Sequence, residues 1–113
     1  MKDESSEKRI FSFDEAAAML PEVRRLTEKA NRAVEELGDS GAEAGGRAHL
    51  QERLDEIVNG WARSLLGMGV EVKGLWLVDF DNGSGYYCWR YPEDGLYFYH
   101  SSEDGFGGRM RIH

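Results

Sequence analysis

The chain has 113 residues, a formal net charge of −7 and one cysteine. This length fits a single domain that buries a core without a metal or disulfide staple, and one unpaired thiol favours a reducing compartment. The acidic balance excludes broad binding to nucleic acid or to an anionic membrane surface. Because the charged N-terminus lacks a signal-peptide pattern and no segment approaches about 20 apolar residues, we predict a cytoplasmic protein without a membrane span.

Two regions are expected along the chain. Residues 1–10 are predicted to be a flexible N-terminal tail, and residues 11–113 a single domain. Within this domain, the apolar pattern predicts a helical hairpin over residues 12–69 and a β-meander with a glycine-rich tail over residues 70–113.

The first helix is expected to start at Ser12, because Ser12 and Glu15 have the spacing of a capping box. Apolar side chains then recur every three or four residues as far as Leu37, as on one face of a helix. Pro21 interrupts this stripe. Either the helix is kinked near Pro21, or a short helix ends at Leu20 and a second one begins. The stripe stays nearly in phase, which favours the single kinked helix.

A second apolar stripe runs from Leu50 to Met68 and includes Trp61, and Gly67 and Gly69 end it. The short glycine-rich linker between the two stripes makes the helices antiparallel neighbours. The combined stripe is longer than a few short strands can cover. We therefore expect coiled-coil-like pairing of two hairpins into a homodimer.

The period changes beyond Gly69. Strand-like runs alternate with turn signals rich in Gly, Asn and Pro, and these runs cover residues 70–80, 86–91 and 96–100. The sequence thus predicts an α+β fold. It consists of a long antiparallel helical hairpin, kinked near Pro21, followed by a small antiparallel β-meander of about three strands.

The loop between the last two predicted strands decides which side chains share a face. A two-residue and a four-residue loop give the same parity. One face then carries Tyr87, Trp89, Tyr91, Leu96, Phe98 and His100, and the other carries Tyr86, Cys88, Arg90, Tyr97 and Tyr99. The first face is more apolar and is expected to pack on the helices.

This parity bears on Cys88 and His100, which together suggest a thiolate–imidazole nucleophile or part of a metal site. Opposite faces of one sheet cannot supply adjacent ligands, and only an odd-length loop with a bulge would bring the two side chains together. No spaced pair of histidines or cysteines typical of a metal site occurs elsewhere. We therefore predict no metal and no cofactor.

Several short motifs are distinctive, above all Cys88-Trp89-Arg90, Tyr99-His100, and Gly105-Phe106 followed by Gly108-Arg109. With Leu20-Pro21-Glu22 and Leu77-Val78-Asp79-Phe80, they resemble the bacterial family known as domain of unknown function 2203. The resemblance covers the chain from about Phe11 to Arg109. It implies a small bacterial protein of no assigned activity, with a candidate site at Cys88, Trp89, Arg90, His100, Glu103, Gly105, Phe106 and Arg109.

The segment from Gly105 to Arg109 allows two interpretations. It is either an anion cradle, in which Arg109 waits for a ligand, or a tight reversal that buries Phe106. The second is favoured, because the segment lacks a phosphate-loop lysine and its strand–loop–helix context. Arg109 is then expected to pair with Glu103 or Asp104, or to stack on the tyrosines.

Two classes of function stay open. The first is a non-enzymatic interaction or oligomerisation module built on the helical hairpin. The second is a small-ligand binder or enzyme that holds a small anionic ligand, with candidate binding residues Trp89, Arg90, His100, Glu103 and Arg109. Because no complete catalytic constellation can be assembled, binding or scaffolding is favoured over catalysis.

Overall fold

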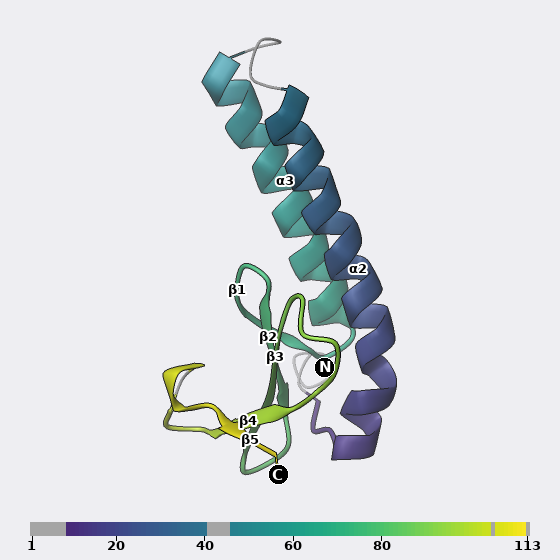
Figure 1. The fold of residues 1–113 in the computed structure, drawn as a ribbon, viewed down its shortest axis with the longest axis vertical. Helices are drawn as coiled ribbons and strands as arrows, with labels where there is room; N and C mark the ends of the chain where they lie inside the picture. Colours follow the sequence, from purple (N-terminus) through teal and green to yellow (C-terminus); the bar gives the residue numbers. More distant parts are fainter. Residues whose placement is uncertain (1–8, 41–45, 105, 113) are drawn as a thin grey trace, which may run out of the picture.

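A helical hairpin and an antiparallel sheet make up the fold in the computed structural model (Figure 1), which describes residues 9–40, 46–104 and 106–112. The predicted α+β class is confirmed, with a sheet of five strands where about three were expected. The elements are α2 (Phe13–Ser40), α3 (Gly46–Gly67), β1 (Glu71–Gly74), β2 (Leu77–Asp81), β3 (Gly85–Arg90), β4 (Phe98–Ser101), the 3-10 turn η1 (Phe106–Gly108) and β5 (Met110–Arg111). The tail predicted for residues 1–10 lies outside the described residues, apart from Arg9 and Ile10.

The start of α2 follows the predicted capping box. The Glu15 amide donates to Ser12 Oγ at 3.1 Å, and the Ser12 amide donates to Glu15 Oε1 at 2.9 Å. Two of the amides that a helix start leaves without partners are thereby satisfied. Pro21 lies inside this one helix, so the alternative of a short helix ending at Leu20 is not what the chain forms.

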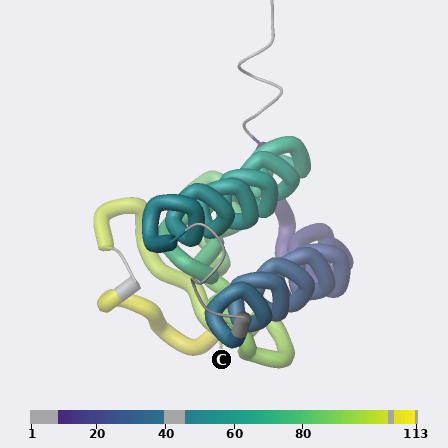
Figure 2. Tube along the Cα trace, turned by 90° about the horizontal axis from the view of Figure 1, so that it is seen from above, coloured from purple at the N-terminus to yellow at the C-terminus, as the bar shows by residue number. Residues whose placement is uncertain are grey.

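The two helices run side by side (Figures 1 and 2), and a buried polar contact joins them. Thr27 Oγ1 donates to the Val23 carbonyl at 2.8 Å and accepts from Trp61 Nε1 at 2.8 Å. Strands cover only the half of the hairpin that begins α2 and ends α3, and the distal half projects beyond the sheet (Figure 1). Neither described helix is long and apolar enough to cross a membrane.

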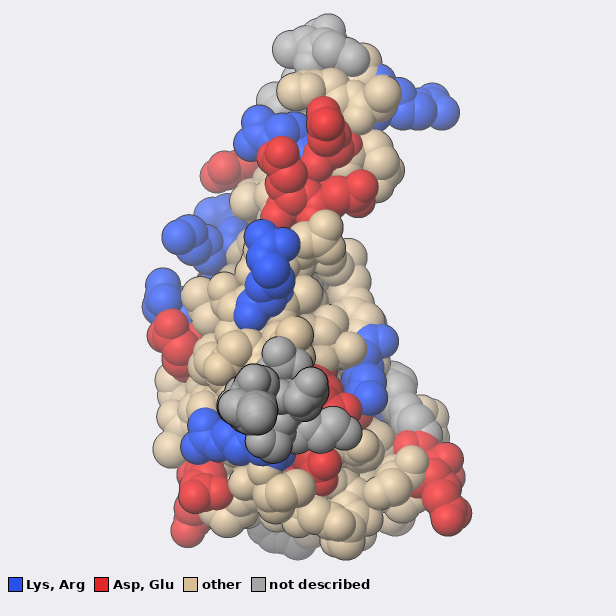
Figure 3. Space-filling model, turned by 180° about the vertical axis from the view of Figure 1, so that it is seen from behind, with Lys and Arg blue, Asp and Glu red and all other residues tan. Residues whose placement is uncertain are grey.

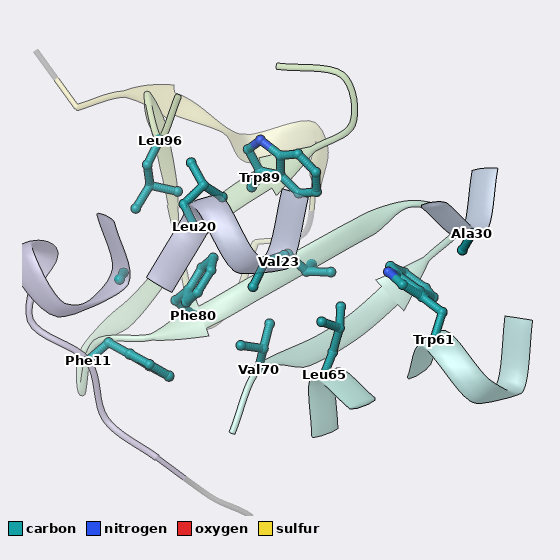
Figure 4. Close-up of a cluster of buried hydrophobic side chains, with 12 residues drawn as sticks. Phe11, Leu20, Val23, Ala30, Trp61, Leu65, Val70, Phe80, Trp89 and Leu96 are labelled. Atoms are coloured by element: carbon teal, nitrogen blue, oxygen red, sulfur yellow. The ribbon is translucent and has the colours of Figure 1, made fainter. Parts of the chain in front are cut away.

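The core lies between the base of the hairpin and one face of the sheet (Figure 4). Its largest fully buried side chains include Trp89, Phe11 and Phe80, and the rings of Phe11 and Phe80 meet edge to face at 5.3 Å. Leu20 and Val23 of α2 complete this layer. Burial of such side chains contributes about 1.5–3 kcal/mol each, which holds the sheet against the helices.

The strands follow one another in the order β1-β2-β3-β4-β5, all antiparallel. The run predicted as one strand over residues 70–80 is in fact a hairpin, which turns at Leu75 and Trp76 between β1 and β2. The turn carries the Trp76 indole to the helices, where Nε1 donates to Asn31 Oδ1 at 3.1 Å and the ring meets Trp61 at 4.8 Å. The position of this turn therefore depends on tertiary contacts of Trp76, which the local sequence pattern does not reveal.

The predicted register between the last two long strands is wrong. Cys88 pairs with Phe98 and Tyr86 with His100, so the loop between β3 and β4 covers residues 91–97 and is odd in length. The loop first makes a tight turn of its own, in which the Glu93 amide donates to the Arg90 carbonyl and the Glu93 side chain accepts from the Arg90 amide. Pairing with β3 resumes only at Phe98.

With this register, the two faces of the sheet carry a different set of side chains from the predicted one. Trp89 and Tyr87 do lie on the helix side, as predicted, and Tyr87 contacts Phe13 of α2 edge to face. Phe98 and His100 were expected on that side too, but they share the opposite, outer face with Cys88. The strand alternation thus brings Cys88 and His100 to one face, contrary to the sequence-based argument.

Candidate functional site

Three buried side chains converge on the outer face of the sheet. Asp79 on β2, Cys88 on β3 and His100 on β4 each leave at most 4% of their surface exposed. Asp79 is directly opposite Cys88 in the β2–β3 pairing, and one ligand atom from each of the three lies within 4.8 Å of the others. Three adjacent strands therefore fix the cluster, and no loop is needed to hold it.

A cavity of about 450 Å³ opens over this cluster. Asp79, Cys88 and His100 are among the residues that line it; the others are Lys73, Leu77, Tyr86, Ser102, Glu103 and Asp104. The volume is in the range of small-molecule sites in proteins.

His100 links the cluster to the backbone. Its Nδ1 is 2.9 Å from the Ser101 carbonyl, and its Nε2 is 2.9 Å from Asp79 Oδ2. A carbonyl only accepts, so Nδ1 carries a proton. The contact between Nε2 and Oδ2 then holds one further proton, which makes the His100–Asp79 pair neutral as a whole.

The surroundings of Asp79 disfavour the charged form of its carboxyl group. Burial raises the pKa of its carboxyl above the ordinary value. The charge and hydrogen bond of His100, a hydrogen bond from the Cys88 thiol and the charge of Lys73 only partly offset this. Asp79 Oδ1 is buried and has no hydrogen-bond partner among the residues that the structure describes. Buried polar atoms nearly always have such a partner, so this oxygen is an exception among the described residues.

Cys88 is not arranged as a nucleophile. Burial, and next the Asp79 charge, raise the pKa of its thiol to about 12, so the thiol is protonated at neutral pH. A thiolate nucleophile needs an adjacent base. His100 cannot act as that base, because both of its ring nitrogens are already engaged by Ser101 and Asp79.

Because of the Cys88 thiol, we expect the free energy of unfolding to fall at alkaline pH. The pKa of this thiol is raised from 9.0 in the unfolded reference to about 12 in the fold. The stabilisation is complete below pH 9 and is lost as the pH rises toward 12, by about 1.4 kcal/mol per unit. Urea unfolding at neutral pH and near pH 10.5 gives the free energy of unfolding of wild type and of Cys88→Ser. We expect the difference in this free energy between the two proteins to shrink as the pH rises. A difference that stays constant with pH would contradict this assignment.

The structure places two of the five predicted site residues at the cavity, His100 in its floor and Glu103 on its exposed rim. Trp89 is instead a fully buried core residue whose Nε1 donates to the Glu93 carbonyl at 2.9 Å. Arg90 is exposed and does not belong to the described lining of the cavity.

The structure describes two side-chain partners of Arg109, Glu93 and Phe98, where Glu103, Asp104 or the tyrosines were expected. Its Nη2 lies 2.7 Å from the Glu93 carboxylate, in a pair that is mostly buried, and its guanidinium stacks 4.0 Å over the Phe98 ring. Glu93 therefore takes the place expected for Glu103 or Asp104. The side chain of Phe106, predicted as a packing anchor, lies outside the described residues.

Sequence reasoning missed Asp79, Lys73 and Tyr86, and it set Cys88 aside. One signal was present for Asp79: a lone carboxylate stands among apolar residues in Leu77-Val78-Asp79-Phe80. A charge in the middle of such a run is buried and needs a partner. Nothing local identified that partner, because His100 lies 21 residues further along the chain.

The chain is a small α+β protein with a helical hairpin and a five-stranded meander. Its buried Asp–Cys–His cluster lies on the outer face of the sheet. The chain belongs to the family described as uncharacterized conserved protein DUF2203, whose model matches residues 9–112. No curated protein and no solved structure is significantly similar to it.

Proposed function

We propose that the protein binds a small positively charged ligand in the outer-face cavity, over the carboxylate of Asp79. One observation carries this proposal: Asp79 is 2% exposed, and its Oδ1 has no hydrogen-bond partner within the described part of the chain. An uncompensated carboxylate oxygen in such a place is costly. A bound cation supplies the missing partner.

The lining of the cavity favours a cation over the anion expected from the sequence. Its acidic lining residues are Asp79, Glu103 and Asp104, whereas Lys73 is its basic one. The Lys73 ammonium is 3.0 Å from the Glu71 carboxylate and 5.4 Å from the centre of the Tyr86 ring. The Tyr86 ring thus already forms a wall that attracts positive charge.

Thermal unfolding with a panel of probes tests the proposal. Putrescine, spermidine, Mg²⁺ and Zn²⁺ serve as cations, and phosphate and citrate as anions. A cation at about ten times its Kd should raise the Tm of wild type by about 5 °C. The shift should be lost in Asp79→Asn, which keeps the side-chain shape, and kept in Asp39→Asn, which alters an exposed carboxylate on α2. Stabilisation by the anions alone, or an equal shift in Asp79→Asn, would overturn it.

A second proposal, self-association, concerns the distal half of the hairpin. There the apolar side chains of Val34, Leu37, Leu54 and Ile57 are only half-buried. The strands lie against the opposite half of the hairpin (Figure 1), and acidic and basic side chains lie interspersed along the rear of the hairpin (Figure 3). A second hairpin would cover this stripe and complete a four-helix bundle.

Light scattering at micromolar concentration measures this directly. We expect a homodimer for wild type and a monomer for Leu54→Glu, because a charge in the stripe opposes its burial. Arg47→Glu, at an exposed position of α3, should leave the dimer intact. A wild-type protein that is monomeric throughout would exclude self-association through the hairpin.

For the compartment we propose the cytoplasm, since the one cysteine is a free, buried thiol.

A further inference from the structure

The cluster on the outer face offers a set of donor atoms that suits a particular kind of cation. It combines a carboxylate oxygen from Asp79, a sulfur from Cys88 and an imidazole nitrogen from His100. Oxygen-only sites suit Mg²⁺ and Ca²⁺, whereas sulfur and imidazole favour Zn²⁺ and its neighbours in the first transition row. A polyamine would make no use of the sulfur.

The orientation of His100 also suits a metal ligand. Its Nδ1 donates to the Ser101 carbonyl, which leaves Nε2 as the nitrogen that faces the cluster. Metal-bound histidines almost always hold their second ring nitrogen in this way, on a carbonyl or a carboxylate, and the tautomer is thereby fixed. The backbone of β4 thus holds the imidazole ready for coordination.

The spacing of the donor atoms is compatible with one ion. Bonds of about 2.0–2.3 Å to a tetrahedral Zn²⁺ place its ligand atoms about 3.3–3.8 Å apart. The three donor atoms lie within 4.8 Å of one another, and His100 Nε2 and Asp79 Oδ2 already stand 2.9 Å apart. Side-chain movements of about 1 Å therefore close the set around an ion.

We propose that Asp79, Cys88 and His100 bind one divalent transition-metal ion of the zinc class. The ion takes the place of the proton shared by Asp79 and His100 and of the thiol proton of Cys88, so that two protons leave when it binds. The ion then bonds Asp79 Oδ2, and Oδ1 gains a partner when the carboxylate coordinates the ion through both of its oxygens. Three protein ligands leave a fourth position open toward the cavity, as in zinc sites that bind a further ligand.

This inference rests on the proposed function of the cavity, which it narrows to one class of cation. It requires Cys88 to be a ligand, which binding of an organic cation does not. That requirement separates the two proposals, because Cys88 is the sole cysteine of the chain. Any metal–thiolate bond in the protein must therefore come from this residue.

Titration of the metal-free protein with Co²⁺ tests the inference by absorption. We expect one Co²⁺ per chain, with the near-ultraviolet charge-transfer band of a cobalt–thiolate bond and the visible bands of a tetrahedral site, and Zn²⁺ should abolish both. Cys88→Ser should lose the charge-transfer band. Asp79→Asn and His100→Gln should each weaken Co²⁺ binding at least about tenfold.

Two controls exclude adventitious binding. His49→Gln changes an exposed histidine on α3, and Asp39→Asn changes an exposed carboxylate on α2, outside the cavity lining. Both variants should bind Co²⁺ as wild type does. Loss of binding in His49→Gln would assign the metal to the helix surface and overturn the inference.

The wild-type spectrum tests the metal site even where a variant of Asp79, Cys88 or His100 fails to fold. Absence of the charge-transfer band at saturating Co²⁺ would overturn the metal site. If putrescine or spermidine still stabilised wild type but not Asp79→Asn, the cavity would keep its proposed function. If neither Co²⁺ nor any other cation bound, both proposals would fall together.

Discussion

Replacing Trp89 with alanine is expected to lower the free energy of unfolding by about 3–5 kcal/mol. The indole is fully buried between the sheet and α2, and it belongs to the main hydrophobic core (Figure 4). Its Nε1 also donates to the Glu93 carbonyl at 2.9 Å. Truncation therefore leaves a large cavity and takes the donor away from a carbonyl in the turn that sets the β3–β4 register.

Urea unfolding of three variants separates these contributions. Trp89→Phe keeps most of the ring volume but loses the hydrogen bond, so its loss should be smaller than that of Trp89→Ala. Met110→Ala, at a side chain that is 48% exposed, should change stability by no more than about 0.5 kcal/mol. A loss below about 1 kcal/mol in Trp89→Ala would mean that the core rearranges to fill the space.

The helices could be predicted because their signals are local. The Ser12–Glu15 capping box is formed as the spacing indicates, and the apolar stripes do face the core at the base of the hairpin. Helix period and cap chemistry depend on residues within about one turn of each other. The turn at Leu75 and Trp76 has no such local signal, since it depends on contacts of Trp76 with both helices.

The faces of the sheet could not be predicted, because one residue of loop length inverts them. The sequence shows turn residues at Pro92-Glu93-Asp94-Gly95, but it does not show that Leu96 is buried before pairing resumes. That burial is a tertiary event, and it adds the residues that make the loop odd in length. The cluster of Cys88 with His100 follows from it.

The candidate site was accordingly predicted only in part. His100 and Glu103 were recognised by their residue types and by the resemblance to the family, and both line the cavity. Arg109 was recognised too, but its strong partner, Glu93, lies in the loop whose path the sequence does not reveal. Charged side chains can be identified as candidates from sequence, whereas their partners depend on strand register.

Replacing Asp79 alone with leucine is expected to cost about 3–5 kcal/mol. The substitution removes a buried hydrogen-bonding group and leaves His100 Nε2 facing an apolar side chain at a position that is 4% exposed. His100→Leu should cost a similar amount, because the Asp79 carboxylate then loses its 2.9 Å contact with the imidazole and stays buried. Urea unfolding at neutral pH measures both losses, and the exposed Asp39→Leu, which should change little, is the control.

The double variant Asp79→Leu/His100→Leu distinguishes a structural role of this pair from a binding role. A buried ion pair replaced on both sides by apolar residues of similar volume is often as stable as the original, since neither group is left without a partner. We therefore expect the double variant to recover most of the stability that each single change loses, which gives a coupling of about 3 kcal/mol or more in the cycle. Such a fold would not need Asp79 and His100 for stability, and their position beneath an open cavity would then be explained by ligand binding, which the double variant should lack. If the double variant instead loses the sum of the two single effects, the pair is a structural tie between β2 and β4, and the cavity loses the main support for its proposed function.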